Sequence, residues 1–161
     1  MQKRSNKPLQ RTIGRGRPLA AERQGVGQTS MPVIIEQVEQ GKPGDELFLS
    51  SQSTNGCAAV VFEDDGETAY FYALETENGP ILDALHVYNV AAVKDRDRLS
   101  EYKIGWSPSG RQAILTINGY PHAVFDFDGR KGWCRTGSPP GNERWSLSGH
   151  DWDESCLARF R

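Results

Sequence analysis

The chain has 161 residues, of which 37% are apolar and 25% are charged, and its formal net charge is −2. This composition is typical of one globular domain with a hydrophobic core, and it excludes an intrinsically disordered chain. No apolar run reaches the 18 residues of a membrane-spanning helix, and no apolar segment follows the basic N-terminus as in a secretory signal, so we expect a cytoplasmic protein with no membrane partner for its main domain.

The charge is divided unevenly along the chain. Residues 1–24 contain seven Lys or Arg and one acid, whereas residues 25–161 contain 12 Lys or Arg and 20 Asp or Glu. An acidic domain repels the phosphate backbone of nucleic acids, so nucleic acid is not expected as a partner except through the basic head. A basic protein is the partner that such a domain would attract.

Residues 1–30 are expected to form a disordered basic head. They contain few bulky apolar side chains, so packing could not offset the entropy lost on ordering. Two interpretations of the head remain open. It is either an arm that binds nucleic acid or an anionic membrane, or a passive appendage that is not part of the native protein, whose start would then be Met31.

Apolar runs separated by turn residues predict a series of strands in the remaining domain, residues 31–161. Asn118-Gly119 and Asp128-Gly129 each follow such a run, and these pairs favour tight hairpin turns, which require positive φ. Residues 81–90 fit either a helix or a strand, and we assign them to a strand. The other expected strands lie near 33–39, 46–50, 57–62, 67–74, 100–106, 111–117, 121–127 and 133–135.

The C-terminal segment 151–160 predicts a helix. Asp151 is placed to cap it, acidic residues fill its first turn, and Arg159 lies near its end, which suits the helix dipole. Trp152, Cys156 and Phe160 follow a spacing of four residues and form one apolar stripe. We therefore expect a mainly β (α+β) fold, a twisted antiparallel β-meander with one C-terminal helix packed on the sheet. The order of the strands cannot be read from the pattern.

Sequence motifs for catalysis are missing. The chain has no nucleophile elbow, no phosphate-binding loop, no dinucleotide-binding glycine motif and no zinc-protease motif. Its three cysteines lack paired spacing, so we interpret them as buried, inert thiols rather than as a disulfide framework. We expect no cofactor, and an enzyme is not the favoured interpretation.

Two neighbouring features are candidates for binding a basic protein partner. The segment after the strand near 57–62 is a dense acidic cluster, and alternation along the next strand places two tyrosines on one face and Phe71 on the other. The simpler alternatives are a solvated hairpin tip and tyrosines covered by the C-terminal helix, and we favour that covering. The candidate contact residues are Glu63, Asp64, Asp65, Glu67, Tyr70 and Tyr72.

A second hypothesis is a metal site, for binding or for metal-assisted catalysis. On the strand near 121–127, alternation places His122, Asp126 and Asp128 on one face, and an imidazole with two carboxylates can hold a divalent ion. His86 from a neighbouring strand is a possible fourth ligand. The alternative is that these residues are the solvated face of an antiparallel strand.

Three runs of the sequence, 60–74, 81–90 and 120–127 followed by Gly132-Trp-Cys-Arg135, resemble a small family of uncharacterised bacterial proteins known only as a domain of unknown function. The resemblance covers about residues 31–160 and implies a single bacterial domain, without an activity to carry over. We therefore expect a non-catalytic acidic protein-binding module, for example an immunity-type protein that neutralises a basic partner, with the metal site as the alternative.

Overall fold

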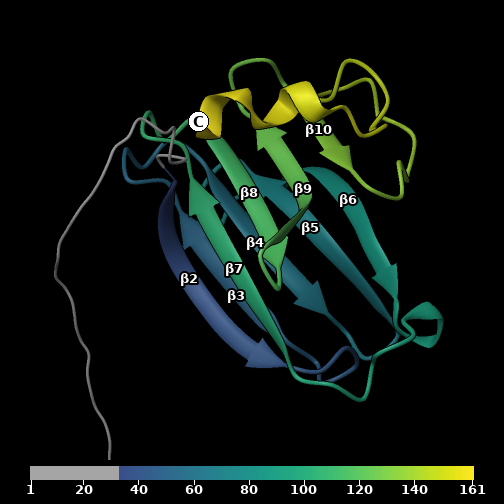
Figure 1. Cartoon of the computed structure of the whole chain (residues 1–161). Coiled ribbons are helices and arrows are strands. Elements are labelled where there is room, and N and C mark those ends of the chain that lie inside the picture. The colour runs from purple at the N-terminus through teal and green to yellow at the C-terminus, as the bar shows by residue number, and fades with distance from the viewer. Residues whose placement is uncertain (1–32) are drawn as a thin grey trace, which may run out of the picture. The chain divides into compact units, whose positions relative to one another are not determined.

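The computed structural model of the chain describes residues 33–161, and the expected basic head at 1–30 lies outside the described residues. Nine strands and two short 3-10 helices follow one another along the described part, and Figure 1 shows their arrangement. In chain order they are β2 (Ile34–Gly41), β3 (Phe48–Gln52), β4 (Ala59–Asp64), β5 (Thr68–Leu74), β6 (Ile81–Asn89), η3 (Val90–Ala92), β7 (Ser100–Trp106), β8 (Gln112–Ile117), β9 (Tyr120–Asp126), β10 (Lys131–Cys134) and η4 (Glu154–Phe160).

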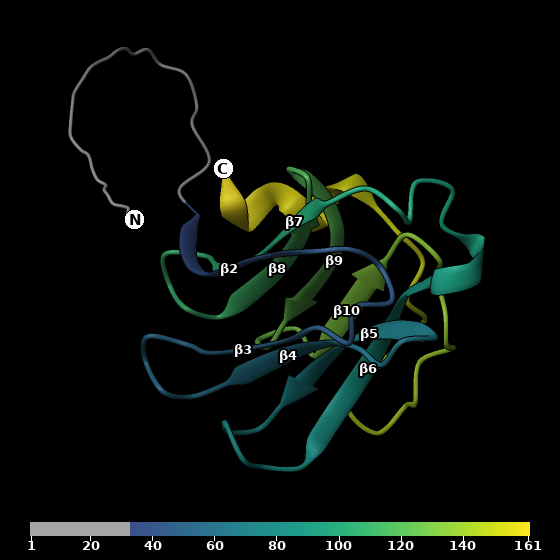
Figure 2. The ribbon, with the colours of Figure 1, turned by 90° about the horizontal axis from the view of Figure 1, so that it is seen from below.

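The strands are antiparallel, as expected, but they form two sheets instead of one meander. One sheet has the order β10-β9-β8-β7-β2 and the other the order β3-β4-β5-β6. Figure 2 shows the two sheets as separate layers. The physical reason is that the strands of each sheet carry one apolar face, and each face is buried against the other. The ambiguous segment 81–90 is the edge strand β6, followed by η3.

The main core lies between the two layers and is rich in aromatic side chains. Phe71 of β5 stacks on Phe125 of β9, with ring centroids 5.3 Å apart, and Phe62 of β4 stacks on Tyr102 of β7 at 5.2 Å. These four side chains are fully buried. The two aromatic pairs therefore join one sheet to the other through the centre of the core.

The C-terminal segment differs from the helix that the sequence predicts. Asp151 forms a β-bridge with Cys134, so helical structure begins only at Glu154 and is a 3-10 helix, η4. The Asp153 carboxylate, and not that of Asp151, accepts a hydrogen bond from the backbone N–H of Ser155. The buried side chains of η4, Cys156, Leu157 and Phe160, cluster with Ile114 of β8 and Val124 of β9 on the outer face of the five-stranded sheet.

The outer face of the four-stranded sheet has no corresponding cover within residues 33–161. In Figure 2, η4 lies beyond the five-stranded layer, and no strand or helix lies on the far side of β3–β6. Phe48 and Ile81, on the two edge strands of this sheet, are 63% and 60% exposed. Among the described residues, no helix is long and apolar enough to cross a membrane.

Candidate functional site

We call the uncovered outer face of β3–β6 the open face. Strand alternation explains it, because the other side of each strand supplies the core. The open face combines apolar, aromatic and acidic side chains, namely Phe48, Val61, Glu63, Tyr70, Tyr72, Leu74 and Ile81.

A shallow groove of about 380 Å³ crosses the open face. Glu63 lies between its two register partners, Phe48 on β3 and Tyr70 on β5. Val61, two residues earlier on β4, pairs with Tyr72. The groove is therefore apolar and aromatic with a carboxylate beside it, and its lining residues are Phe48, Val61, Glu63, Tyr72, Leu74, Glu77, Gly79 and Ile81.

Tyr70 and Tyr72, the two tyrosines of the open face, pack against each other. Their rings stack with centroids 5.8 Å apart, and Tyr70 also contacts the His86 ring edge-on at 5.3 Å. Burial raises the pKa of Tyr72, and the nearby Glu63 charge adds to this effect. The expectation that the C-terminal helix covers the tyrosines is wrong, because η4 clusters with Ile114 and Val124 of the other sheet.

The acidic cluster at 63–67 divides into two kinds of residue. Asp65 and Glu67 are exposed, and the pKa of Asp65 is lowered because its carboxylate accepts hydrogen bonds from the N–H groups of Thr68 and Glu67. Asp64 is only 1% exposed. Its carboxylate accepts hydrogen bonds from the Tyr88 hydroxyl at 2.6 Å and from the Gly44 N–H at 2.7 Å. Asp64 therefore connects the β2–β3 loop to strand β6 and does not lie on the open face.

The charge of the domain is concentrated in the segment that contains the four-stranded sheet. Residues 43–93 contain no Lys or Arg and nine acids, whereas residues 33–42 and 94–161 together contain 12 Lys or Arg and 11 acids. The acidic residues of this segment are Asp45, Glu46, Glu63, Asp64, Asp65, Glu67, Glu75, Glu77 and Asp83. A cation that approaches the open face therefore meets no Lys or Arg side chain from these strands or their connections.

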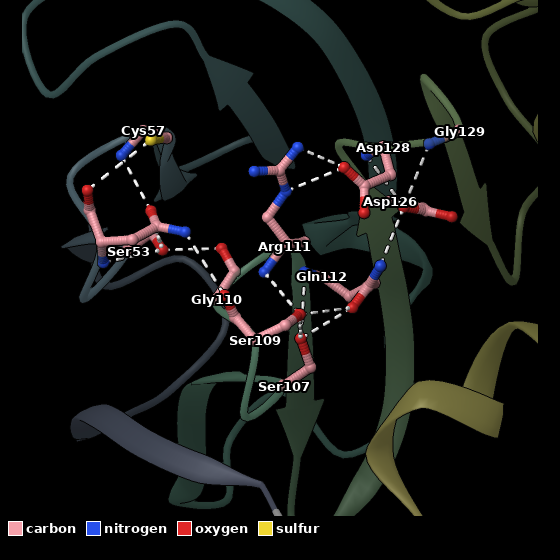
Figure 3. Close-up of polar contacts among 11 residues, drawn as sticks. Ser53, Cys57, Ser107, Ser109, Gly110, Arg111, Gln112, Asp126, Asp128 and Gly129 are labelled. Carbon is pink, nitrogen blue, oxygen red and sulfur yellow. Dashed lines mark hydrogen bonds and ion pairs between the residues drawn. The ribbon is translucent and has the colours of Figure 1, made fainter.

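The two aspartates of the metal hypothesis have other partners, which Figure 3 shows. Asp128 forms an ion pair with Arg111, whose Nε donates to its carboxylate at 2.8 Å. The Asp126 carboxylate accepts a hydrogen bond from Gln112 Nε2 at 3.0 Å and another from the N–H of Gly129. These contacts stabilise the β9–β10 turn and its junction with β8.

His122 lies four residues before Asp126 on β9. Two residues four positions apart on one strand face are about 13 Å from each other, too far to bind one ion. Burial lowers the pKa of His122 to about 4, and the adjacent Arg135 charge contributes to this shift. Within residues 33–161, no three His, Cys, Asp or Glu side chains are grouped so as to hold a metal ion. His86, on the other sheet, instead contacts Asn89 at 3.0 Å.

The three cysteines are not equivalent, which corrects the interpretation of all three as buried thiols. Cys57 is exposed, whereas Cys134 and Cys156 are buried. Burial raises the pKa of Cys156 to about 12, so its reactive thiolate is scarce at neutral pH.

Thiol labelling will distinguish the cysteines. With a maleimide at pH 7, we expect the native protein to react rapidly at Cys57 alone and the denatured protein to react at all three thiols, because only Cys57 is exposed. Mass spectrometry of the intact chain counts the adducts, and a Cys57→Ser variant is the control. Rapid native labelling of that variant would contradict the burial of the other two.

Several residues of the open face were not identified from the sequence. Phe48, Val61 and Ile81 line the groove, but short runs do not tell which face of a strand is covered. One signal was available: the absence of Lys and Arg from residues 43–93 is visible in the sequence. The net charge of residues 25–161 as a whole does not reveal this signal, because it combines the acidic segment 43–93 with the nearly balanced remainder.

The fold and the open face define a β-sandwich domain with one uncovered acidic, aromatic sheet face. Residues 41–161 match the model of a family described as "Uncharacterized protein conserved in bacteria (DUF2251)", and the chain belongs to this family. A protein of Haemophilus influenzae, named only "Uncharacterized protein", is 50% identical over 92 residues, which cover 52% of this chain and 57% of that protein. No solved structure matches the chain.

Proposed function

We propose that this bacterial domain is a non-catalytic protein-binding module that holds a basic protein partner on its open face. The observation that carries the proposal is the combination of an uncovered aromatic sheet face with a surrounding segment that has nine acids and no Lys or Arg. Neutralising a basic toxin, as an immunity protein does, is one form that this function would take.

The composition of the open face supports this proposal. Tyrosine and other large rings are enriched where protein partners bind, because they bury much area at little entropic cost. Exposed Phe48 and Ile81 would gain from being covered. Carboxylates around such a face exclude acidic partners and favour basic ones. The proposed contact residues are Glu63, Asp65, Glu67, Tyr70 and Tyr72. Buried Asp64 has a structural role, since its hydrogen bonds hold the neighbouring backbone in place.

Site-specific photo-crosslinking in the native bacterium tests the proposal. A photoreactive amino acid replaces Tyr72 on the open face, and the matched control replaces Lys103, on the outer face of the five-stranded sheet. We expect one basic protein to crosslink from position 72 and not from position 103. The purified partner should then bind the unmodified chain, and a Glu75→Gln, Glu77→Gln variant should bind it at least several-fold more weakly because two carboxylates are lost.

Two results would overturn the proposal. The first is equal crosslinking from positions 72 and 103, which would mean that the captured protein does not distinguish the two faces. The second is a purified partner whose affinity is the same for the wild type and the double Gln variant. The metal hypothesis for His122, Asp126 and Asp128 has no supporting contact in the described part of the chain.

A further inference from the structure

We propose that Glu63 is the anchor of the open face and that it binds an arginine side chain of the basic partner, held in the groove between Phe48, Val61 and Tyr72. This inference rests on the proposed function, because it names the chemical group by which the partner is recognised. It concerns one carboxylate and one groove, so it can be tested separately from the binding of the partner.

The surroundings of Glu63 are the first argument. Its Cα partners on the neighbouring strands are Phe48 and Tyr70, so its carboxylate emerges between two aromatic side chains. Glu63 is only partly exposed, yet no residue in 33–161 donates a side-chain hydrogen bond to it or forms an ion pair with it. A carboxylate that is partly withdrawn from water gains strongly from a cation, because the cation replaces lost hydration.

The aromatic side chains favour arginine over lysine as that cation. A guanidinium group is planar, stacks on aromatic rings and can donate two parallel hydrogen bonds to one carboxylate, whereas an ammonium group is a compact, strongly hydrated charge. Tyr70 and Tyr72 provide stacked rings beside Glu63. The methylene stem of an arginine can lie along Phe48 and Val61, which line the same groove.

The second carboxylate of the groove strengthens the argument. Glu77, from the β5–β6 connection, lines the groove together with Glu63. Residues 43–93 contain no Lys or Arg, so this segment supplies no cation that would compete with a partner for these two acids. The groove therefore combines two acceptors, an aromatic wall and an apolar floor, which together are complementary to a basic segment that carries arginine.

An NMR titration of the full chain with short peptides tests the anchor. The probes are acetyl-Gly-Arg-Gly-amide and the same peptide with citrulline, which keeps the shape of arginine but lacks its charge. We expect the arginine peptide to shift the backbone signals of Val61, Glu63 and Tyr72 with a millimolar dissociation constant. The citrulline peptide should bind at least tenfold more weakly. A lysine peptide should fall between the two.

Two variants that lose the same charge make the test specific. Glu63→Gln should weaken binding of the arginine peptide about tenfold, because it removes a charge-assisted hydrogen bond. Glu39→Gln, on exposed strand β2 of the other sheet, should change the affinity less than twofold. Equal binding of arginine and citrulline peptides would overturn the anchor. Equal losses in the two variants would do so as well, since they would indicate general charge attraction.

The anchor and the proposed function can fail separately. If a partner crosslinks from position 72 and its affinity is unchanged in Glu63→Gln, the binding module stands and the arginine anchor is wrong. If the arginine peptide binds at Glu63 but no protein crosslinks from position 72, the groove recognises arginine and the proposed function is wrong.

Discussion

Replacing His150 with alanine is expected to lower the free energy of unfolding by about 3–5 kcal/mol, because it leaves a buried carboxylate without its partner. His150 is 1% and Asp83 4% exposed, and His150 Nε2 lies 2.8 Å from Asp83 Oδ2. The other ring nitrogen, Nδ1, contacts the carbonyl oxygen of Pro139. Since both partners only accept hydrogen bonds, the ring is protonated and donates from both nitrogens.

The effect should depend on pH in a defined direction. Burial alone lowers the pKa of His150, but the hydrogen bond and the charge of Asp83 outweigh it, so the pKa lies above its ordinary value. The stabilisation is therefore complete below about pH 6.5, the unfolded value, and is lost as the pH rises through the folded pKa. Urea unfolding of the wild type and of His150→Ala at pH 5.5 and pH 9 measures this difference.

His86→Ala is the matched control for that experiment, since His86 is partly exposed and makes one side-chain hydrogen bond, to Asn89. We expect the control to cost less than about 1 kcal/mol. A difference between wild type and His150→Ala that is small, or that is larger at pH 9 than at pH 5.5, would contradict a charged buried pair.

The second large effect is expected from Asp64→Ala, which should lower the free energy of unfolding by about 3 kcal/mol and the melting temperature by about 10 °C. The wild-type carboxylate accepts hydrogen bonds from Tyr88, Gly44 and Gly66. Its removal leaves the partly buried N–H groups of Gly44 and Gly66 without this acceptor, and the Tyr88 hydroxyl keeps only its contact with the Tyr102 hydroxyl. Thermal unfolding followed by circular dichroism measures the change.

Asp65→Ala is the neighbouring control for Asp64→Ala. Asp65 is exposed, and its carboxylate accepts hydrogen bonds only from local N–H groups, so we expect its removal to lower the melting temperature far less than the removal of Asp64 does. The two variants should therefore differ clearly in melting temperature. Asp64→Ala destabilises the fold, whereas the exposed neighbour leaves it nearly intact. Similar melting temperatures for the two variants would show that Asp64 is not buried as described.

Local patterns predicted the strands because alternation and turn residues are local properties. The hairpin expected at Asn118-Gly119 is present, and both residues have the positive φ that such a turn requires. At Asp128-Gly129 a turn also forms, but the residue with positive φ is Arg130. The division into two sheets was not readable, because β2 pairs with β7, about 65 residues later in the chain.

The candidate site shows the same limit. Alternation separated Phe71 from Tyr70 and Tyr72, and the structure shows that Phe71 is the buried one of the three. It also contained a signal that was not used: Asp64 follows Phe62 by two residues and shares its buried face. For the metal hypothesis, a shared face was taken for proximity, although His122 and Asp126 are separated along the strand. Distances between side chains depend on strand packing, which the pattern does not contain.

The uneven charge of the two sheets has a consequence for encounter rates. One layer carries a large negative excess while the rest of residues 33–161 is nearly balanced, so the domain has an electric dipole directed through the sandwich. A basic protein diffusing nearby would be turned toward the four-stranded sheet before any contact formed, and productive collisions would become more frequent. The separation of charge between the layers would then raise the association rate through long-range orientation, in addition to the effect of the residues in contact.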